Sequence, residues 1–465
     1  MSGKADGREI NGRKIGLISL SALVFSSMVG AGIFSLPQNM AAVSGAQALI
    51  IGWIITGVGI IFLGLSFFML ARLRPDLTGG IYTYARTGFG NLIGFLSAWG
   101  YWLCATIGVV SYLVVMFAAL SMFTDTPDAN GTVRIIFGNG NTIYAIIGES
   151  IVLWSVHWLV SRGIKEAASI NLVATLAKTL PILFFIGVAV FYFQPAVFVA
   201  DFKGASLDVS LWDQVRNTML ITLWVFTGIE GASVLSARAK NMRAVGYATL
   251  IGVVLALVIY MAITLLAFGL IPREQIAGLT NPSMAGLLSM MIGPFGKVLI
   301  VLCLIVSVSA SYLSWVLFSA EVPHIGAKHG AFPKILTRVN KNGTPIASLW
   351  LTSATVQFCL ILVLFTEQTY ETLLMIASVM VLLPYLFVGL FLCKVSFFND
   401  VNIAVGEKNK SLIWAKIIGT CASIYGIWLV YAAGTELLLM SIYLYIPGLF
   451  IYAYSRYKYK SKYKK

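Results

Sequence analysis

The sequence SMVGAGIF, at residues 27–34, interrupts an apolar stretch that extends over residues 15–43. A second glycine-containing sequence, WVFTGIEG at residues 224–231, interrupts another apolar stretch about 200 residues later. Glycine is a poor helix former, and it lets the backbone turn and a ligand approach it closely. Interrupted hydrophobic segments at matching positions in two halves of a chain are typical of the substrate site of a membrane transporter.

The composition places the whole chain in a lipid bilayer. Of 465 residues, 59% are hydrophobic and 11% are charged. Soluble domains average about 45–50% apolar and about 25% charged residues. A soluble protein of this length could not cover its surface with so few charges, so this composition excludes soluble enzymes, disordered chains and disulfide scaffolds. It predicts a polytopic membrane protein.

Twelve apolar stretches are long enough to cross a hydrocarbon core, which requires about 20 residues per helix. They lie at about 15–43, 46–71, 91–123, 142–160, 166–193, 213–237, 246–271, 287–320, 346–366, 371–393, 411–433 and 436–454. Backbone polar groups inside lipid must be satisfied within the segment, so these stretches are expected to be helices. The predicted fold is therefore all-α, with twelve transmembrane helices.

The two interruptions divide these helices into repeats. Each opens a unit of five spans, over residues 15–193 and 213–393, and the helices carrying them, spans 1 and 6, are discontinuous. Five is odd, so the second unit enters the membrane from the opposite side, which gives an inverted repeat. Residues 411–454 add two helices, between an N-terminal tail at 1–14 and a basic tail at 455–465.

The basic residues predict the orientation of the chain. With the N-terminus inside, 26 of the 32 lysines and arginines fall in cytoplasmic segments. This asymmetry is a strong positive-inside signal, with both termini cytoplasmic. The net charge of +14 thus reflects topology, and we expect no nucleic-acid partner. The tail RYKYKSKYKK, residues 456–465, is also expected to contact anionic lipid headgroups.

An unwound helix offers groups that suit an amino acid. The amides that begin the second half-helix carry partial positive charge and can bind a carboxylate. The carbonyls freed at the end of the first half-helix carry partial negative charge and can accept from an ammonium group. Two breaks side by side would therefore hold a zwitterionic head group. The alternative is that the glycines serve helix packing, because small residues are common where membrane helices meet.

At these residues the chain resembles the amino acid–polyamine–organocation superfamily, and within it the basic amino acid/polyamine antiporters. The similarity covers nearly the whole chain, and three motifs are the most specific. They are GAGIFSLP at 30–37, WVFTGIE at 224–230 and HGAFPKILTRVNKNGTP at 329–345. The segment from Arg162 to Pro181 resembles the arginine/ornithine antiporters in particular. The resemblance implies the inverted-repeat fold and sodium-independent exchange.

The resemblance also implies roles for single residues. The substrate-binding set is Met28, Gly30, Ala31, Gly32, Trp224, Thr227, Gly228 and Trp315. In it, amides at 30–32 bind the carboxylate, and carbonyls near Met28, Trp224 and Thr227 take the ammonium group. The ring of Trp224 closes the outer gate, and the face of Trp315 stacks on a cationic side chain.

Two departures bear on specificity. An asparagine that touches the guanidinium group in arginine/agmatine antiporters aligns with Val109 here, and a serine near the side chain aligns with about Met375. Both polar contacts would then be absent. Lysine, ornithine, histidine and decarboxylated products therefore remain open as substrates beside arginine.

Two ionisable residues lie deep within spans, where charge is costly and usually functional. Glu230 matches a proton-sensing glutamate of the family, and its alternative is a structural carboxylate. Lys178 matches a lysine that, in related sodium-independent carriers, lies where sodium-coupled relatives hold a sodium ion, so it could replace that charge or carry a proton. Glu149 and His157 could form a proton relay, but satisfied interhelical contacts are favoured.

The predicted function is exchange of cationic amino acids, or of a decarboxylated amine, by alternating access across the inner membrane. A proton-coupled amino acid permease is the alternative, and a channel or a nutrient sensor on the same fold is disfavoured. We expect no enzymatic activity, no catalytic residue, no metal and no cofactor. The expected partners are small-molecule substrates and the lipid bilayer, and a homodimer is left open. The polar residues Glu321, His324 and His329, at the inner end of the eighth span, are expected to serve interfacial capping and to be solvated.

Overall fold

A computed structural model describes residues 14–125, 134–365, 369–398 and 410–463. Helices make up nearly all of this part of the chain, and it contains no β-strand. A single isolated β-bridge joins Ile15 to Ala239 there. The predicted all-α class is therefore confirmed.

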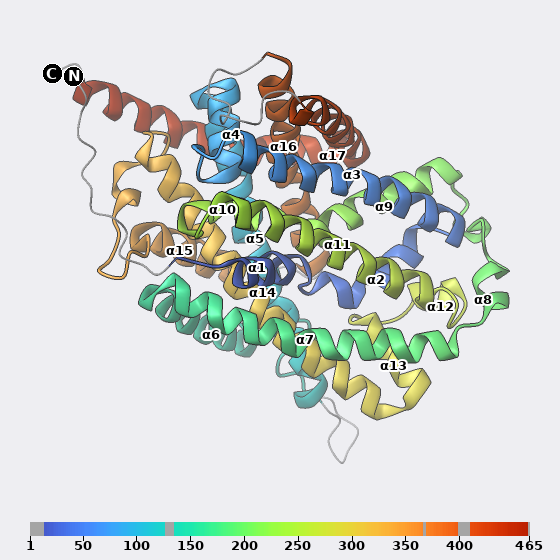
Figure 1. Ribbon diagram of the computed structural model, residues 1–465. Coiled ribbons are helices and arrows are strands. Elements are labelled where there is room, and N and C mark those ends of the chain that lie inside the picture. Colours follow the sequence, from blue (N-terminus) through green and yellow to red (C-terminus); the bar gives the residue numbers. More distant parts are fainter. Residues whose placement is uncertain (1–13, 126–133, 366–368, 399–409, 464–465) are drawn as a thin grey trace.

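The helices and their bounds follow the chain order of Figure 1. The first half contains α1 (Leu17–Met28), α2 (Gly32–Val43), α3 (Ala46–Leu73), α4 (Gly80–Phe89), α5 (Asn91–Thr124), α6 (Ile143–Arg162), α7 (Ile164–Tyr192) and α8 (Pro195–Ala200). The second half contains α9 (Leu211–Phe226), α10 (Gly231–Val234), α11 (Met242–Ala267), α12 (Arg273–Ala277), α13 (Ser283–Ile292), α14 (Pro294–Lys328), α15 (Ile346–Val363), α16 (Thr369–Phe397) and α17 (Lys410–Tyr463). Short 3₁₀ turns are η1 (Ala205–Leu207), η2 (Ser236–Arg238) and η3 (Lys334–Thr337).

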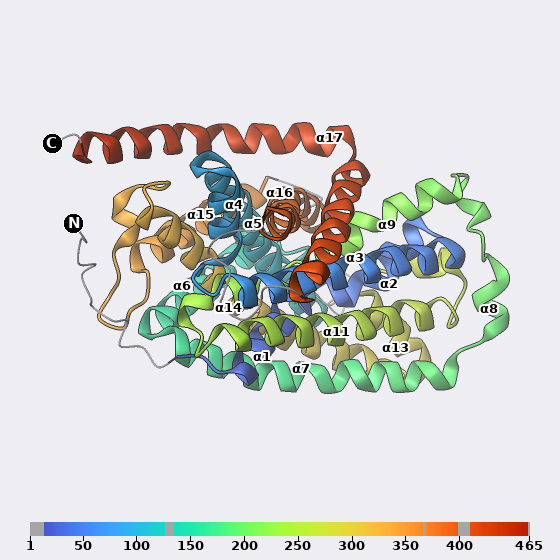
Figure 2. The same ribbon diagram turned by 45° about the horizontal axis from the view of Figure 1, so that its top comes forward.

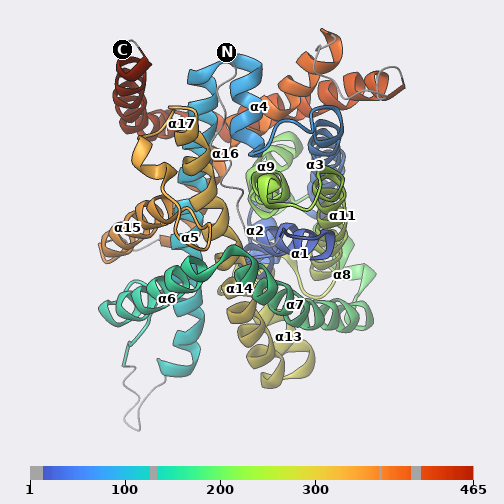
Figure 3. The same ribbon diagram turned by 60° about the vertical axis from the view of Figure 1, so that its left-hand side comes forward.

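Two sets of helices surround the broken ones. Helices α3, α11 and α7 lie along nearly the same axis, with α3 antiparallel to the other two, and α1 packs between α11 and α7 (Figure 1). Helices α5 and α14 pack on each other and run obliquely to that set, as the turned view shows (Figure 3). Helix α16 packs against α5 and α17, and α17 bends sharply so that its second part runs along the edge of the molecule (Figure 2). The broken helices therefore lie inside the bundle.

Ten helical segments are long and apolar enough to cross a membrane within the described residues. One of them covers residues 17–43 across the first break, and another covers residues 412–459. Helix α9, which precedes the second break, has only 16 residues and is therefore not one of these ten segments. A multi-pass membrane protein is therefore confirmed.

Both predicted helix breaks are present. Helix α1 ends at Met28 and α2 begins at Gly32. Helix α9 ends at Phe226 and α10 begins at Gly231. Gly228, in the second break, has φ of 113°, in the region that glycine adopts without strain.

Helix α14 covers Pro294–Lys328, so the bounds predicted for this span, 287–320, are wrong. The predicted span both begins and ends too early. Its apolar start belongs to a separate helix, α13, and the chain turns at Gly293, where φ is 82°. The polar residues after 320 were expected to lie beyond the end of the helix. The structure instead buries Glu321 and His324 inside the helix, where each has a partner.

A helix–turn–helix pattern occurs twice. The ten-residue helix α4 leads into α5 through Gly90, and the ten-residue helix α13 leads into α14 through Gly293. The two glycines have nearly the same backbone angles, φ 95° and ψ 175° against φ 82° and ψ −171°. Hydropathy did not reveal α4, because it is short and amphipathic.

A close helix crossing provides a test of this packing. A Cβ atom at Gly100 of α5 would lie 2.6 Å from the Met380 carbonyl oxygen of α16, whereas one at Gly187 of α7 would meet nothing within 4 Å. We expect Gly100→Ala to lower stability by about 1–3 kcal/mol through overpacking. Gly187→Ala should be neutral or stabilising, because alanine is the better helix former. Thermal melting of both purified variants measures this, and equal melting temperatures would contradict the crossing.

Candidate functional site

The two helix breaks lie against each other in the centre of the bundle. The Ser27 hydroxyl donates a hydrogen bond of 3.1 Å to the Gly228 carbonyl oxygen, which links the first break to the second. The indole N–H of Trp315 on α14 donates to the Ser27 carbonyl oxygen, also at 3.1 Å. Sequence positions about 200 residues apart thus lie side by side.

The first break leaves amides available for an anion. The Gly30 amide donates to the Met28 carbonyl oxygen at 2.8 Å, in a tight turn. The amides of Ala31 and Gly32, where α2 begins, have no acceptor among the described residues. The first amides of a helix point outward and carry partial positive charge. This arrangement suits a carboxylate, although the Gly30 amide is already used within the turn.

Two aromatic rings stand over these glycines. A Cβ atom at Gly32 would lie 3.0 Å from Nε1 of Trp224, and one at Gly30 would lie 2.6 Å from the Tyr112 hydroxyl. The rings of Trp224 and Tyr112 are 6.3 Å apart. Any side chain larger than glycine would collide with one of them. Trp224 thus lies where a gate over the head group is expected, and Tyr112 is a neighbour that sequence reasoning missed.

Lys178 occupies the carbonyl end of the first break. Its Nζ atom lies 2.5 Å from the Val29 carbonyl oxygen and 3.1 Å from both the carbonyl and hydroxyl oxygens of Ser26. The Ser311 hydroxyl is 3.3 Å away. The side chain is fully buried. An ammonium at the C-terminal end of α1 compensates carbonyls that the helix leaves without intrahelical partners.

Further polar residues on α7 and α14 hold the same region. Asn171, seven residues before Lys178 and so on the same helix face, donates to the Ala310 carbonyl oxygen at 2.6 Å and to the Ser314 hydroxyl at 2.7 Å. The Ser307 hydroxyl donates to the Val29 carbonyl oxygen at 3.1 Å. Serines at 307, 311 and 314 recur at helical spacing in an apolar span, and that period was the signal that could have found them.

The second break contains Glu230. Its carboxylate accepts a hydrogen bond of 2.5 Å from the Tyr385 hydroxyl of α16 and one of 3.3 Å from the Gly228 amide. The Thr227 hydroxyl donates to the Leu223 carbonyl oxygen within α9. The carboxylate therefore joins the broken helix to α16 and is fully buried. No motif or residue spacing in the sequence indicated that Tyr385 is the partner of Glu230.

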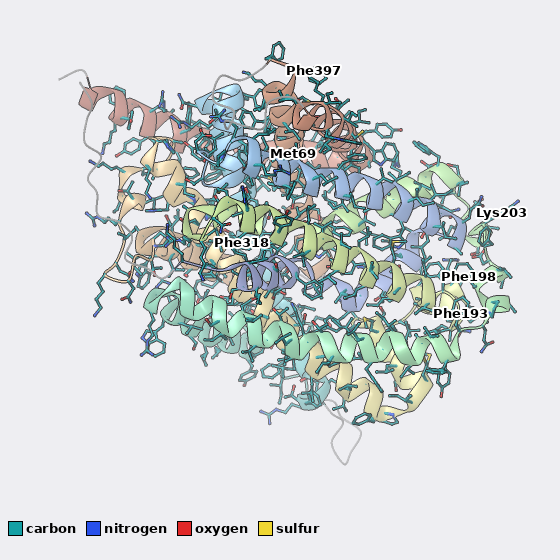
Figure 4. The ribbon with its side chains drawn as sticks, viewed as in Figure 1. Met69, Phe193, Phe198, Lys203, Phe318 and Phe397 are labelled. Atoms are coloured by element: carbon teal, nitrogen blue, oxygen red, sulfur yellow. The ribbon has the colours of Figure 1, made fainter. Side chains whose placement is uncertain are left out.

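Trp315 lies between the first break and the aromatic residues of α5 and α14. Its ring centroid is 6.0 Å from that of Tyr101 and 5.8 Å from that of Phe318. Phe318 lies in the middle of the bundle near α10 (Figure 4), and a Cβ atom at Gly231 would lie 2.3 Å from it. Trp315 is 2% exposed. A substrate cation stacking on its face would require these rings to separate.

One specificity prediction is wrong. Met375 was expected near the substrate side chain, but it is 47% exposed on the outer face of α16. Ser378, three residues later, is fully buried instead. The loss of a polar contact at this position is therefore not supported. Val109 is fully buried on α5, where the neighbouring Gly108 faces the ring of Trp224.

Glu149 and His157 do not form a relay with each other. The Nδ1 atom of His157 lies 2.8 Å from the Ser353 hydroxyl of α15, which is the interhelical contact that was favoured. Glu149 is fully buried on α6, and neither of its carboxylate oxygens has a hydrogen-bond partner within the described ranges.

One end of the bundle is closed by a buried ion pair. Arg238 contacts Glu321 of α14 at 2.8 Å, and both side chains are at most 9% exposed. The Ile15 amide donates to the Arg238 carbonyl oxygen at 2.9 Å, which brings the start of α1 to the same place. Nδ1 of His324 lies 3.0 Å from the Leu336 carbonyl oxygen. Interfacial capping and solvation were expected for Glu321 and His324, and the solvation is wrong, because both side chains are buried against protein partners.

The opposite end is closed around Arg273 of α12. Its guanidinium group contacts the Asp201 carboxylate at 2.7 Å and the Ala41 carbonyl oxygen at 2.8 Å, and it also contacts Ser206. Burial raises the pKa of Asp201, but hydrogen bonds from Arg273, Ser206 and the Ala205 amide outweigh it and keep that pKa below its ordinary value. Figure 4 places Phe193, Phe198 and Lys203 at this end.

The close contact between the breaks gives a stability prediction. Gly228 and Gly90 both have positive φ, so alanine should strain the backbone at either position by about 1 kcal/mol. Only at Gly228 would the new Cβ also lie 2.8 Å from the Cβ atom of Ser27 and 3.0 Å from its carbonyl carbon. We expect Gly228→Ala to lower the melting temperature clearly more than Gly90→Ala. Equal losses would show that the breaks are not packed as described.

Comparisons with known proteins show the family of the chain. The sequence profile described as amino acid permease matches residues 15–455. The chain is 54% identical over 444 residues to the protein of Escherichia coli (strain K12) named "Putative arginine/ornithine antiporter", with 96% of this chain and 92% of that protein covered.

Two other relatives are similar over comparable lengths. The arginine/agmatine antiporter of Chlamydia felis is 44% identical over 446 residues, which cover 95% of this chain and 89% of that protein. The arginine/ornithine antiporter of Pseudomonas aeruginosa is 43% identical over 459 residues, which cover 96% and 92%. With its two adjacent helix breaks and these similarities, the chain belongs to the amino acid permease family.

Proposed function

We propose that this protein exchanges cationic amino acids across the bacterial inner membrane by sodium-independent alternating access. The exchanged pair is drawn from arginine, lysine, ornithine and a decarboxylated amine. The observation that carries the proposal is the pair of adjacent helix breaks, with open amides at one and a fixed lysine on its carbonyls. The names of the relatives, all antiporters of arginine, support the substrate class.

The head group of the substrate binds at the two breaks. Its carboxylate accepts from the amides of the 30–32 segment, chiefly Ala31 and Gly32, because these begin a helix and have no acceptor in the described structure. Its ammonium group donates to carbonyls near Met28, Trp224 and Thr227, and Gly228 lets the backbone come close.

The cationic side chain binds beside aromatic residues. The face of Trp315 is the proposed stacking partner, since a cation over an indole ring gains about 0.5–2 kcal/mol. Trp224 closes over the head group from outside. Glu230 senses charge, and its hydrogen bond to Tyr385 joins that carboxylate to α16.

We also propose twelve membrane crossings in a five-plus-five inverted repeat, over residues 15–193 and 213–393, with two further helices at 411–454. Helix α9 and the break that follows it together form one of these crossings, although α9 alone, with 16 residues, is too short. The 48-residue segment at 412–459 bends at Gly434 and would be about 70 Å long if straight, so it accounts for two crossings.

Matching elements support the repeat. Helices α3 and α11 have 28 and 26 residues, α5 and α14 have 34 and 35, and α6 and α15 have 20 and 18. The two members of each of these pairs pack against each other. The turns at Gly90 and Gly293 fall at corresponding places as well.

Contacts at the two ends support cytoplasmic termini. Ile15 pairs with the Arg238–Lys240 segment, and the Ser236 hydroxyl accepts from the Gly79 amide, so segments predicted to be cytoplasmic meet one another. At the other end, Arg273 meets segments predicted to be outside. The predicted tails are residues 1–14 and 455–465, and in the latter α17 continues to Tyr463. A homodimer stays a prediction that none of these contacts tests.

Lys178 takes the place of a coupling sodium ion in this proposal. Carbonyl and hydroxyl oxygens surround its Nζ atom, and such oxygens are ligands that hard cations prefer. A tethered ammonium group fills the position permanently, so no gradient of that ion would drive transport.

Replacing Lys178 tests this role. We expect Lys178→Met to lower arginine uptake at least about tenfold, because charge-assisted hydrogen bonds to the break are lost. The matched control is Thr179→Val, since the neighbouring Thr179 is half-buried and donates to a carbonyl of its own helix. Uptake is normalised to monodisperse protein. Equal activity of the Lys178→Met variant and wild type would rule out the role.

Counterflow in proteoliposomes tests exchange itself. Vesicles loaded with unlabelled ornithine should accumulate labelled arginine without any ion gradient, and empty vesicles should not. Exchange requires this result, because the empty carrier does not reorient easily. Equal uptake into loaded and empty vesicles, increased by an imposed proton gradient, would favour the alternative, a permease with Lys178 as proton carrier.

A further inference from the structure

A basic cavity lies at one end of the bundle, away from the substrate site. Its volume is about 680 Å³, and it is enclosed by the last turn of α14, the η3 segment and the end of α17. The views in Figures 1 and 3 both place the end of α17 beside the segment that carries η3. The residues that matter for its chemistry are Lys328, Lys334, Lys458, Phe332, Tyr454 and Tyr459.

The charge of the cavity favours an anion. Lys328, Lys334 and Lys458 come from the three enclosing elements, and all three are exposed. No aspartate or glutamate lines the cavity among the described residues. The carboxylate of Glu321 on the same helix α14 is engaged by Arg238. Three lysines around one space create a local positive potential that attracts a phosphate-sized anion.

The position of the cavity favours a membrane lipid over a soluble anion. Along the second part of α17, exposed side chains are apolar through Leu449 and Phe450 and aromatic at Tyr454, and the exposed Lys458 follows after the half-buried Arg456. That order is typical of the boundary between hydrocarbon and headgroups. Beside it, Ile335 is 55% exposed on η3. The cavity therefore has an apolar wall and a basic wall at headgroup depth.

The walls are held by defined contacts. A Cβ atom at Gly330 would lie 2.5 Å from the Tyr459 ring, so α17 packs closely on the turn after α14. The Lys458 ammonium lies 4.7 Å from the centroid of the Tyr454 ring. His324 ties α14 to η3 through the Leu336 carbonyl oxygen. The space is thus a formed site between packed elements.

We propose that this cavity binds the phosphate-bearing headgroup of an anionic membrane lipid. The three lysines surround the phosphate, and Phe332 and Tyr454 contact the glycerol and the start of the acyl chains. Basic pockets between helices on the cytoplasmic side are suited to such headgroups. Lys328 ends the helix that also carries Ser311 and Trp315, so a bound lipid would steady the inner end of that substrate-site helix.

Lipid binding to the full-length protein in detergent tests the proposal. Phosphatidylglycerol and phosphatidylcholine are titrated separately, and bound lipid is counted by native mass spectrometry. The pocket variant combines Lys328→Gln, Lys334→Gln and Lys458→Gln. The control variant combines Lys240→Gln, Lys341→Gln and Lys416→Gln, which removes the same charge from residues outside the cavity.

We expect the wild type and the control variant to prefer phosphatidylglycerol, and the pocket variant to bind it about 100-fold more weakly. Single Lys458→Gln should show a smaller loss, which keeps the test decisive if the triple variant is unstable. Equal losses in both triple variants, or equal binding of both lipids by the wild type, would overturn the proposal. Displacement of phosphatidylglycerol by inorganic phosphate at equal concentration would assign the cavity to a soluble anion and overturn the proposal of a lipid site.

Discussion

The structure depends on one buried lysine, Lys178, at the end of a helix that stops in the middle of the bundle. Breaking α1 at Met28 leaves carbonyl oxygens directed into an environment without water, which would cost several kcal/mol if they stayed unpaired. Lys178 supplies the donors, at 2.5 Å from the Val29 oxygen and 3.1 Å from the Ser26 oxygen. The hydrogen bonds from Lys178 to these carbonyls offset both the cost of the broken helix and the cost of burying the lysine. With the carbonyl end occupied, the amide end remains for a ligand.

Charged contacts lie at both ends of the bundle. Arg238 with Glu321 and Arg273 with Asp201 each join segments that lie far apart in the chain. A buried ion pair adds little net stability over apolar packing, but breaking it is costly. Such contacts suit gates that must be fully made or fully broken. Between them lie two residues of the proposed substrate site, Trp315 and Trp224, which are 2% and 5% exposed.

Much of this architecture was predictable, because hydropathy and glycine breaks are local properties of the sequence. The breaks at 29–31 and 227–230, and Lys178 as the one deep lysine, followed from the sequence. The predictions that failed concern features that depend on contacts with residues distant in the chain. The end of α14 was placed too early because Glu321 looks solvated until Arg238 is seen beside it. The position aligned with about Met375 was expected near the substrate side chain, and an approximate alignment does not fix which residue of a helix turn is buried: Met375 is 47% exposed, whereas Ser378 is fully buried. Tyr385 had no sequence signal.

A cryo-EM structure of the protein with bound arginine tests the central claim most directly. If the broken helices form the substrate site, density for the α-carboxylate will lie within hydrogen-bond distance of the Ala31 and Gly32 amides, with Lys178 still on the Val29 carbonyl oxygen. The guanidinium group will then lie near Trp315. Arginine bound elsewhere, or a carboxylate held directly by the Lys178 ammonium group, would contradict the account.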